Sequence, residues 1–501
     1  MSACPTDFAV VIPTIGRASL GRLLTALDTG AGPPPAAVIV VDDRPVPAPL
    51  ELPPMGLPVK VVRSGGRGPA AARNTGWRST SAEWICFIDD DVVPDVDWRA
   101  KVAADLDAAD SSVAGVQARI VVPQPCGRRP TDDERRTLGL ATAQWITADM
   151  AYRRSALVAC GGFDERFPRA YREDADIGLR ITRSGGRIVK GARRSTHPVP
   201  ARRPSPITSV RAQVGNRDDA LMRRKHGRCW REHAGAGAGR MRLHALTTAA
   251  AVVAAAAAVI GWWRVAAAAL LSWLGLTADF AARRIAPGPR TRTEITAMAV
   301  SSALIPSVAV AQRLCGTWLF RRAVAEPPLA VLFDRDDTLI ADGPFLNDPD
   351  GVVPIAGAVA ALKALRAHGL LVGVVTNQSG VARGLITPEQ LTAVNARVDE
   401  LLGPFDDWQI CVHDVGDGCR CRKPAPGMVI AAADALGVDP GRCVVIGDTG
   451  GDVGAATAAG ARAILIPTRR TRREEIADAR ATGKLAGSLD EAVSLVLGGP
   501  R

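Results

Sequence analysis

Apolar runs that end in polar residues recur through the first part of the chain, and more polar stretches separate them. The runs AVVIP, AVIVVDD, VKVVRS and WICFIDDD predict buried strands, and the stretches between them predict helices. This alternation, over about residues 1–235, is typical of a mainly parallel sheet flanked by helices. In such α/β sheets, ligands bind beyond the carboxyl ends of the strands, where the acidic residues of these runs fall.

The same alternation resumes near residue 326 and continues to the end of the sequence. Strands are predicted by LAVLFDRD, GLLVGVVTNQSG, CVVIGDTGGD and ARAILIPT. Because 501 residues exceed what one hydrophobic core holds, we expect separate domains. The expected division is an α/β domain at 1–235, an apolar helical segment at 236–325 and a second, Rossmann-like α/β domain at 326–501.

The segment between the two α/β domains contains three apolar stretches, at 246–263, 265–280 and 295–312. The first is uncharged over 18 residues, which is the minimum for a bilayer span, while Asp279 and Pro306 interrupt the other two. Alanine-rich helices packed in a soluble bundle would give a similar pattern. The paired Trp262 and Trp263 and the flanking arginines are typical of interfacial anchors and favour the membrane.

The chain is basic, with 62 Lys and Arg against 51 Asp and Glu and a net charge of +11. This balance suits phosphates, sugar nucleotides or an acidic lipid surface. Nucleic acid is not an expected partner, because no basic helix interleaved with aromatics and no known binding module is present. Ten cysteines without a disulfide framework indicate a reducing compartment, and the chain enters its first strand without a leader-like segment. We therefore expect cytosolic catalytic domains.

Paired carboxylates follow the first strand of the C-terminal domain. Asp334 and Asp336 lie two positions apart just past a strand end, so both side chains can enter one cleft. One can attack phosphorus while the other donates a proton to the leaving group and later activates water. Thr376 and Asn377 end the next predicted strand, where they can hydrogen-bond phosphoryl oxygens.

Further charged residues complete this predicted phosphate site. Arg422 and Lys423 offer positive charge for the phosphate, and Asp448 and Asp452 follow the strand CVVIG. Magnesium prefers oxygen ligands, so these acids suit a Mg²⁺ site. The metal would offset repulsion between the attacking carboxylate and the dianionic phosphate.

Residues 329 to about 490 resemble the haloacid dehalogenase superfamily, whose four motifs occur here in order. The resemblance implies Mg²⁺-dependent hydrolysis through an aspartyl-phosphate, with a nucleophile, a general acid/base, two phosphate-holding residues and three magnesium ligands. In that order these are Asp334; Asp336; Thr376 and Lys423; and Asp334, Asp336 and Asp448. The family usually has glycine where this chain has Asp337, and an extra carboxylate there would slow turnover or alter metal binding.

Three cysteines and a histidine crowd into the eleven positions before the expected phosphate-binding lysine: Cys411, His413, Cys419 and Cys421. Three thiolates and one imidazole suit a closed, structural, tetrahedral Zn²⁺ site, although a mobile loop with four unrelated residues remains an alternative. The loop resembles the zinc-containing branch of the superfamily, which includes heptose 1,7-bisphosphate 7-phosphatases and histidinol-phosphate phosphatases. CRCRKPAPGM and TNQSGVARG look more like the heptose enzymes. A sugar phosphate is therefore the expected substrate.

An acid cluster, FIDDDVVPD, ends a buried strand in the N-terminal domain. At least two of its carboxylates project together into a cleft, where they can hold Mn²⁺ or Mg²⁺ on a nucleoside diphosphate. With VIVVDD, GGRGPAAARNTGW, GGFDERF and REDADIGLRI, this cluster resembles the inverting, family-2-like glycosyltransferases of the GT-A fold, over residues 7–230.

That resemblance implies a role for each of several side chains. Asp43 and its neighbour read the nucleotide base, and Arg73 and Asn74 lie along the donor site. Asp89 and Asp91 handle metal and diphosphate, His197 completes the metal site, and Asp174 deprotonates the acceptor hydroxyl. His197 is equally consistent with a structural histidine.

Together these patterns predict a bifunctional enzyme at the cytoplasmic face of the cell membrane. The N-terminal domain would transfer a sugar from a nucleotide sugar to an unknown acceptor, and the C-terminal domain would trim a sugar phosphate. Both would lie on one side if the first two apolar segments form a hairpin. Two alternatives remain. In one, an active phosphatase carries a non-catalytic sugar-nucleotide-binding domain; in the other, the chain is a membrane scaffold with a decayed phosphatase.

Overall fold

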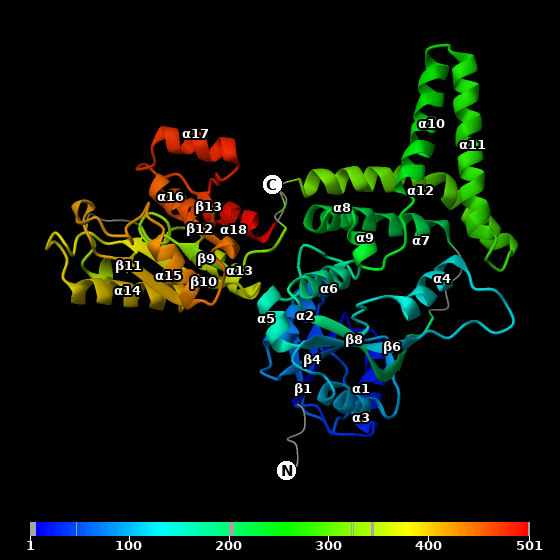
Figure 1. Cartoon of the computed structure of the whole chain (residues 1–501), viewed down its shortest axis with the longest axis horizontal. Coiled ribbons are helices and arrows are strands. Elements are labelled where there is room, and N and C mark those ends of the chain that lie inside the picture. The colour runs from blue at the N-terminus through cyan, green and yellow to red at the C-terminus, as the bar shows by residue number, and fades with distance from the viewer. Residues whose placement is uncertain are drawn as a thin grey trace. The chain divides into compact units, whose positions relative to one another are not determined.

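The computed structural model describes residues 7–46, 48–199, 205–321, 323, 325–341 and 345–498. The chain divides into two compact units, Met1–Ala325 and Glu326–Arg501 (Figure 1). Both units are built on a sheet with helices on its two faces, as the alternating sequence pattern predicts. The predicted α/β fold class is confirmed in both.

The N-terminal unit contains an eight-stranded sheet in the order β3-β2-β1-β4-β7-β6-β8-β5. Its strands are β1 Phe8–Thr14, β2 Ala37–Asp42, β3 Val59–Arg63, β4 Trp84–Ile88, β5 Val93–Pro94, β6 Val113–Val121, β7 Asp149–Arg153 and β8 Arg187–Thr196. β3, β2, β1 and β4 are parallel, as the sequence predicts. β7 is antiparallel to both of its neighbours, so the sheet is mixed.

Helices cover both faces of this sheet, and alternating side chains of β1 divide between the two cores. Phe8, Val10 and Ile12 pack with the first set of helices, α1 Ser19–Thr29 and α3 Trp98–Asp107. Ala9 and Val11 pack on the opposite face with α2 Pro69–Arg78, α5 Arg154–Cys160 and α6 Glu173–Arg183. The short α4 Asp132–Leu138 and the 3₁₀ helix Gly139–Thr142 follow β6.

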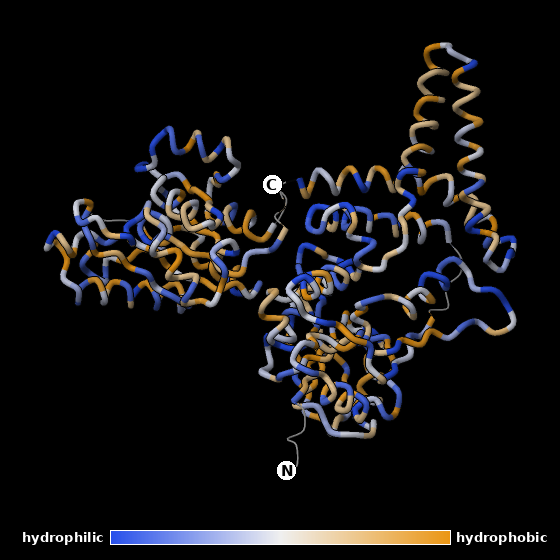
Figure 2. The backbone as a smooth tube through the Cα atoms, viewed as in Figure 1, coloured by the Kyte–Doolittle hydropathy of each residue, from blue (hydrophilic) through white to orange (hydrophobic). Residues whose placement is uncertain are grey.

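Three long apolar helices follow the shorter α7 Pro206–Arg211, 3₁₀ helix Ala212–Val214, α8 Gly215–His226 and α9 Trp230–His233. They are α10 Met241–Val259, α11 Trp263–Ile285 and α12 Arg292–Leu319, and each is long and apolar enough to cross a membrane. α10 and α11 form a hairpin whose residues are mainly hydrophobic (Figures 1 and 2). Only 11% and 6% of their most apolar windows are buried, against 44% in α12, which packs on α7 and α8.

The C-terminal unit is a five-stranded parallel sheet in the order β11-β10-β9-β12-β13. Its strands are β9 Ala330–Phe333, β10 Leu371–Asn377, β11 Asp407–Cys411, β12 Cys443–Gly447 and β13 Arg462–Leu465. The helices are α13 Ala358–Ala367, α14 Pro388–Leu402, α15 Gly427–Ala435, α16 Gly450–Ala458, α17 Arg473–Thr482 and α18 Leu489–Leu497. Short 3₁₀ helices occupy Pro349–Gly351, Val415–Asp417 and Pro440–Arg442.

Two cores enclose this second sheet. α13, α14 and α18 pack on one face, and α15 and α16 pack on the other. β9 lies between β10 and β12, so the strand order reverses at its carboxyl end. Such a switch point is where open α/β sheets bind their ligands.

Candidate functional sites

Three carboxylates meet at the switch point of the C-terminal sheet. Asp334 directly follows β9 and Asp448 directly follows β12, and because the two strands are adjacent and parallel, both side chains reach the same edge. Asp452 joins them from the first turn of α16. One ligand oxygen from each of the three lies within 4.8 Å of the others, which is close enough to share a metal ion.

Burial and a lysine set the electrostatics of this cluster. Burial raises the pKa of Asp334 to about 7 and that of Asp448 to about 6. Lys423 places its Nζ 2.9 Å from Asp334 Oδ1 and 2.6 Å from Asp452 Oδ1. Although burial alone would lower the pKa of Lys423, the two carboxylates raise it, so the lysine stays charged. Three buried acids facing one ammonium leave room for a divalent cation.

Asp336 lies outside this carboxylate cluster. Its oxygens accept hydrogen bonds from Arg335 Nε at 2.9 Å and from Gln378 Nε2 at 2.7 Å. Asp452, rather than the predicted Asp336, completes the carboxylate group with Asp334 and Asp448. The carboxyl group of Asp336 is thereby held beside the nucleophile, where a general acid/base is needed.

Gln378 is a functional candidate that the sequence reasoning missed, although it directly follows the predicted Thr376 and Asn377. Its Nε2 also donates to Thr376 Oγ1 at 2.9 Å, so one amide fixes both a predicted phosphate-holding hydroxyl and the predicted acid/base. Asn377 instead brackets the backbone of Lys423, accepting from its N–H at 3.1 Å and donating to its C=O at 3.3 Å. Asn377 therefore positions the lysine.

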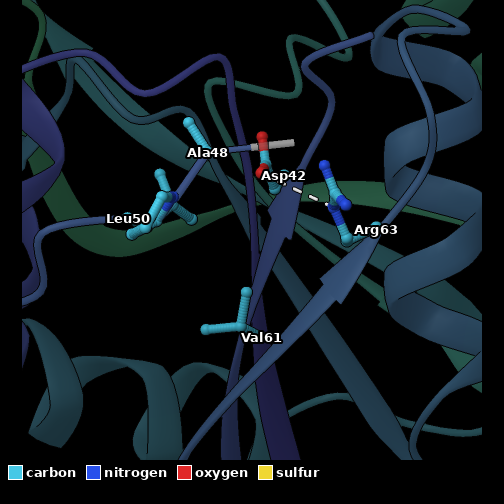
Figure 3. A pocket seen from close by; sticks show the side chains of 6 residues that line it. Asp42, Ala48, Leu50, Val61 and Arg63 are labelled. Atoms are coloured by element: carbon cyan, nitrogen blue, oxygen red, sulfur yellow. Dashed lines mark ion pairs between the residues drawn. The ribbon is translucent and has the colours of Figure 1, made fainter. Parts of the chain in front are cut away.

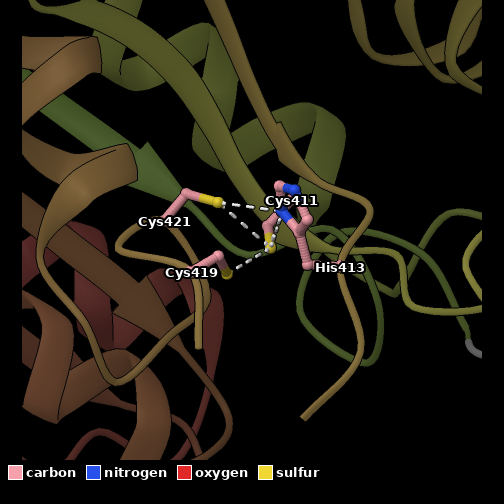
Figure 4. A group of neighbouring side chains, drawn as sticks. All are labelled: Cys411, His413, Cys419 and Cys421. Atoms are coloured by element: carbon pink, nitrogen blue, oxygen red, sulfur yellow. Dashed lines mark hydrogen bonds between the residues drawn. The ribbon is translucent and has the colours of Figure 1, made fainter. Parts of the chain in front are cut away.

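The four residues of the cysteine-rich loop converge (Figure 4). Cys411 Sγ lies 3.4 Å from Cys421 Sγ and 3.8 Å from Cys419 Sγ. His413 Nδ1 lies 3.7 Å from Cys411 Sγ and 3.3 Å from Cys421 Sγ. With Zn–S bonds of about 2.3 Å and Zn–N bonds of about 2.0 Å, a tetrahedron places sulfurs about 3.8 Å apart and sulfur and nitrogen about 3.5 Å apart. The observed distances match those edges closely.

This loop is attached to the phosphate site. Cys421 precedes Lys423 by two residues, and the intervening Arg422 donates from Nη1 to the His413 carbonyl at 3.1 Å. The guanidinium of Arg422 therefore braces the loop, whereas the sequence reasoning expected it on the phosphate. A two-point ion pair between Arg383 and Asp414, at 2.7 and 3.0 Å, ties the segment after β10 to the same loop.

The acid cluster after β4 in the N-terminal unit is neutralised by two arginines. Asp90 and Asp91 both accept from Arg17 Nη1 at 2.9 Å, and Asp89 accepts from Arg73 Nη2 at 2.9 Å. Arg17 was missed by the sequence reasoning, although it closes the quoted run AVVIPTIGR. These contacts place positive charge where a nucleoside diphosphate would bring negative charge.

The predicted metal triad is only partly assembled. His197 Nε2 lies 3.6 Å from Asp91 Oδ1, whereas Asp89 faces Arg73. Within the part of the chain that the structure describes, Asp89, Asp91 and His197 do not bring three ligand atoms within 4.8 Å of one another.

The first turn of α6 carries the predicted base. Arg73 is buried and bridges Asp89 to Glu173 Oε1, the latter at 2.9 Å. Burial raises the pKa of Glu173 to about 8 and also raises the pKa of Asp174. Asp174 is half-buried, and one of its oxygens accepts from the Ala175 N–H at 2.7 Å. Arg73 therefore organises the carboxylates at the end of β4 and the start of α6.

Two other predicted donor-site residues hold loops in place. Asn74 Nδ2 donates to Phe163 O at 2.8 Å and its Oδ1 accepts from Phe163 N at 2.9 Å, which fixes the loop before α6. Asp43 accepts from Ser64 Oγ at 2.7 Å and from Gly68 N at 2.9 Å. Both residues thus shape the site through the backbone.

A pocket of about 350 Å³ opens beside Asp43, lined by Asp42, Ala48, Pro49, Leu50, Val61 and Arg63 (Figure 3). Asp42 ends β2 and Arg63 ends β3, while Leu50 and Val61 supply apolar surface. A two-point hydrogen bond from Arg44, at 2.8 and 2.9 Å, lowers the pKa of Asp42 and keeps it ionised. An apolar floor with one carboxylate suits a flat heterocycle with a hydrogen-bond donor.

A buried ion-pair network connects α6 to the helices that precede the apolar segment. Asp176 lies 2.8 Å from Arg180, 2.6 Å from Lys225 and 2.7 Å from His226 of α8. Asp219 of α8 likewise pairs with Arg172 at 2.9 Å, immediately before the predicted base, and with Arg313 of α12 at 3.2 Å. The sequence reasoning did not identify these pairs.

Comparison with known proteins matches each unit to a separate family. Residues 9–157 match glycosyl transferase family 2, and residues 342–460 match the haloacid dehalogenase-like hydrolases. A D-glycero-beta-D-manno-heptose-1,7-bisphosphate 7-phosphatase from Pseudomonas putida is 36% identical over 148 residues, covering 28% of this chain and 85% of the relative. The Vibrio cholerae enzyme of that name is 35% identical over 158 residues, covering 29% and 85%.

A solved structure is also similar to the C-terminal part of the chain. It is the D,D-heptose 1,7-bisphosphate phosphatase from B. bronchiseptica, complexed with magnesium and phosphate. It is 28% identical with a TM-score of 0.30, and the match covers 34% of this chain and 98% of that one. The sequence matches confirm the predicted fusion: the C-terminal unit belongs to the same family of haloacid dehalogenase-like phosphatases, and the N-terminal unit carries a glycosyl transferase family 2 domain.

Proposed function

We propose that this chain is a bifunctional enzyme of sugar metabolism. Its C-terminal unit hydrolyses a sugar phosphate, with D-glycero-β-D-manno-heptose 1,7-bisphosphate as the first candidate because the matched relatives carry that name. Its N-terminal unit transfers a sugar from a nucleotide donor with inversion. The observation that carries the phosphatase proposal is the placement of Asp334, Asp448, Asp452 and Lys423 in one buried cluster at the switch point.

In the proposed phosphatase reaction, Asp334 attacks phosphorus and forms an aspartyl-phosphate while the sugar hydroxyl leaves. Asp336 donates the proton to that oxygen and then accepts one from the water that hydrolyses the intermediate. Lys423, 2.9 Å from Asp334, keeps the nucleophile ionised and faces the phosphoryl oxygens. Asp334, Asp448 and Asp452 would hold Mg²⁺, which supplies charge neutralisation between carboxylate and phosphate.

The cysteine-rich loop holds a structural Zn²⁺ in this proposal. Four protein ligands close the coordination sphere, so no position is left for a reacting water. The ion would fix the loop whose end delivers Lys423, because Cys421 lies two residues before it. Metal content of purified protein, measured by mass spectrometry, tests this directly, and a chain without tightly bound zinc would exclude it.

For the transferase, Asp174 is the proposed base. Its partner Glu173 is occupied by Arg73, and its pKa of about 8 leaves it largely protonated at neutral pH. The pocket beside Asp42 would take the nucleotide base, and Asp89, Asp91 and His197 would hold Mn²⁺ or Mg²⁺ on the diphosphate. Donor binding then requires Arg17 and Arg73 to turn from the carboxylates toward the phosphates.

The present contacts of those arginines also favour a second candidate for the N-terminal unit. A domain whose acid cluster stays neutralised by Arg17 and Arg73 would bind a sugar nucleotide without turning it over. Release of nucleoside diphosphate from a panel of donors distinguishes the two. Turnover that is lost in Asp174→Asn supports the transferase, and binding without turnover supports the alternative.

We further propose that α10 and α11 cross the membrane as a hairpin, with α12 in the interface. The two hairpin helices are largely unburied, whereas α12 packs on α7 and α8. This arrangement keeps both catalytic units on the cytoplasmic face. Protease added outside sealed right-side-out vesicles should cleave neither unit, and cleavage of only one unit would sink the topology.

The test of the phosphatase is phosphate release by the full-length chain with Mg²⁺. Heptose 1,7-bisphosphate and histidinol phosphate are compared, with Asp334→Asn as the blank. Turnover of the bisphosphate that EDTA abolishes supports the proposal. Turnover that survives Asp334→Asn would refute it.

A further inference from the structure

The residue after the predicted acid/base has an unusual backbone conformation. Asp337 has φ +55°, in the left-handed region that favours glycine. Its N–H donates to the Ile340 carbonyl at 2.8 Å, which fixes this conformation in the turn after β9. A non-glycine residue there costs roughly 1 kcal/mol, and aspartate is among the residues that tolerate it best. The side chain is thereby held in one direction at the rim of the phosphatase site.

The carboxylate of Asp337 faces an arginine from the loop after β13. Its Oδ2 lies 3.2 Å from Arg470 Nε, and the arginine side chain is 58% exposed. The loop itself is anchored to the carboxylate cluster, because Thr468 Oγ1 donates to Asp448 Oδ2 at 2.9 Å and Thr471 Oγ1 donates to the Asp448 carbonyl at 2.6 Å. Arg470 is therefore carried to the edge of the site that Asp334 and Asp448 form.

A guanidinium at this rim matters because the site is otherwise acidic. A substrate with a second phosphate would bring two more negative charges past the carboxylates of the cluster. Arginine binds phosphate through a planar fork of donors, and such charge-assisted contacts are among the strong ones. An exposed ion pair contributes only about 0–1 kcal/mol, so a dianionic phosphate can draw Arg470 from Asp337 at little cost.

We propose that Arg470 binds a second anionic group of the substrate, a phosphate remote from the one that is hydrolysed, and that Asp337 positions Arg470 for this contact. This inference rests on the proposed phosphatase function and deepens it by assigning a residue to the choice of bisphosphates over monophosphates. It also gives the aspartate that replaces glycine a role at the entrance of the site.

The test compares the full-length wild type with Arg470→Ala, Arg470→Lys and Asp337→Gly. Arg469→Ala is the matched control, since Arg469 is exposed in the same loop. Initial rates of phosphate release are measured with heptose 1,7-bisphosphate and with heptose 7-phosphate. Loss of one charged hydrogen-bonding contact predicts that Arg470→Ala raises KM for the bisphosphate at least about tenfold, with little change in kcat.

The constants for the monophosphate should change less than twofold in Arg470→Ala. Arg470→Lys should recover part of the affinity, and Asp337→Gly should raise KM for the bisphosphate alone. Equal effects on both substrates, or an equal effect of Arg469→Ala, would overturn the proposal.

Failure of the heptose substrate is distinguishable from failure of this inference. If p-nitrophenyl phosphate is hydrolysed and the heptose is not, fructose 1,6-bisphosphate and fructose 6-phosphate are compared as inhibitors. Arg470→Ala should then weaken inhibition by the bisphosphate alone, and unchanged inhibition would contradict the role of Arg470. Inactivity toward every phosphate ester would overturn both proposals.

Discussion

Replacing Asp176 with asparagine is expected to destabilise the N-terminal unit far more than replacing Lys225 with methionine, although each removes one charge from the same buried network. Two carboxylates there face three permanent cations and a histidine whose pKa burial lowers, so the histidine is neutral at pH 7: Asp164 and Asp176, then Arg166, Arg180 and Lys225, then His226. The two substitutions leave different charge balances.

Lys225→Met leaves two complete ion pairs, Arg166 with Asp164 at 2.6 Å and Arg180 with Asp176 at 2.8 Å. Its cost should stay near 1 kcal/mol, as for an ordinary substitution. Asp176→Asn leaves three cations around Asp164 alone. Breaking a buried pair in this way typically costs about 3–5 kcal/mol.

Scanning calorimetry on the full-length chain in detergent measures the difference. For a unit of this size each kcal/mol shifts Tm by about 2–4 °C, so Asp176→Asn should lower Tm by roughly 10 °C and Lys225→Met by about 3 °C. Lys101→Met is the control, because its ion pair with Asp97 has a similar length, 2.8 Å, but is exposed. An equal or larger shift in Lys225→Met would refute the charge-balance reasoning.

Three further predictions follow from the described contacts. Because burial raises the pKa of Glu173 to about 8, the folded state holds a proton that the unfolded state releases near pH 4.5, so stability should fall by up to about 1.4 kcal/mol per pH unit between pH 5 and 8; Glu173→Gln should flatten that slope in denaturant titrations, and an unchanged slope would assign it elsewhere. Cys421→Ser should abolish zinc binding and lower phosphatase kcat together, and loss of zinc with full activity would contradict the link to Lys423. Trp262 and Trp263 at the hairpin turn should be shielded from aqueous iodide only when lipid vesicles are present, and quenching that does not respond to lipid would argue against insertion.

The strand-end residues of the C-terminal unit were predictable because a parallel sheet brings the carboxyl ends of its strands to one edge. Asp334, Thr376 and Asp448 each end or directly follow an apolar run, and the structure places them there. The spacing of Cys411, His413, Cys419 and Cys421 likewise predicted a cluster that the structure assembles. Local pattern and short-range spacing carry this kind of information.

Contacts between distant segments were beyond the reach of the sequence pattern. Arg17 meets Asp90 and Asp91 across more than seventy residues, and Gln378 meets Asp336 across 42. The antiparallel direction of β7 was equally hidden, because an apolar run does not reveal the direction of its strand. For the same reason, the side chain of Asp336 was assigned to the metal, while its hydrogen bonds turn it toward Arg335 and Gln378.

Phosphorus NMR of the full-length chain with heptose 1,7-bisphosphate and Mg²⁺ tests the phosphatase proposal most directly, because it reports both turnover and which phosphate is lost. The proposal predicts that the 7-phosphate signal decays, that inorganic phosphate and heptose 1-phosphate appear, and that Asp334→Asn shows neither. Loss of the 1-phosphate instead, or an unchanged spectrum from protein that is folded and holds zinc, would contradict it.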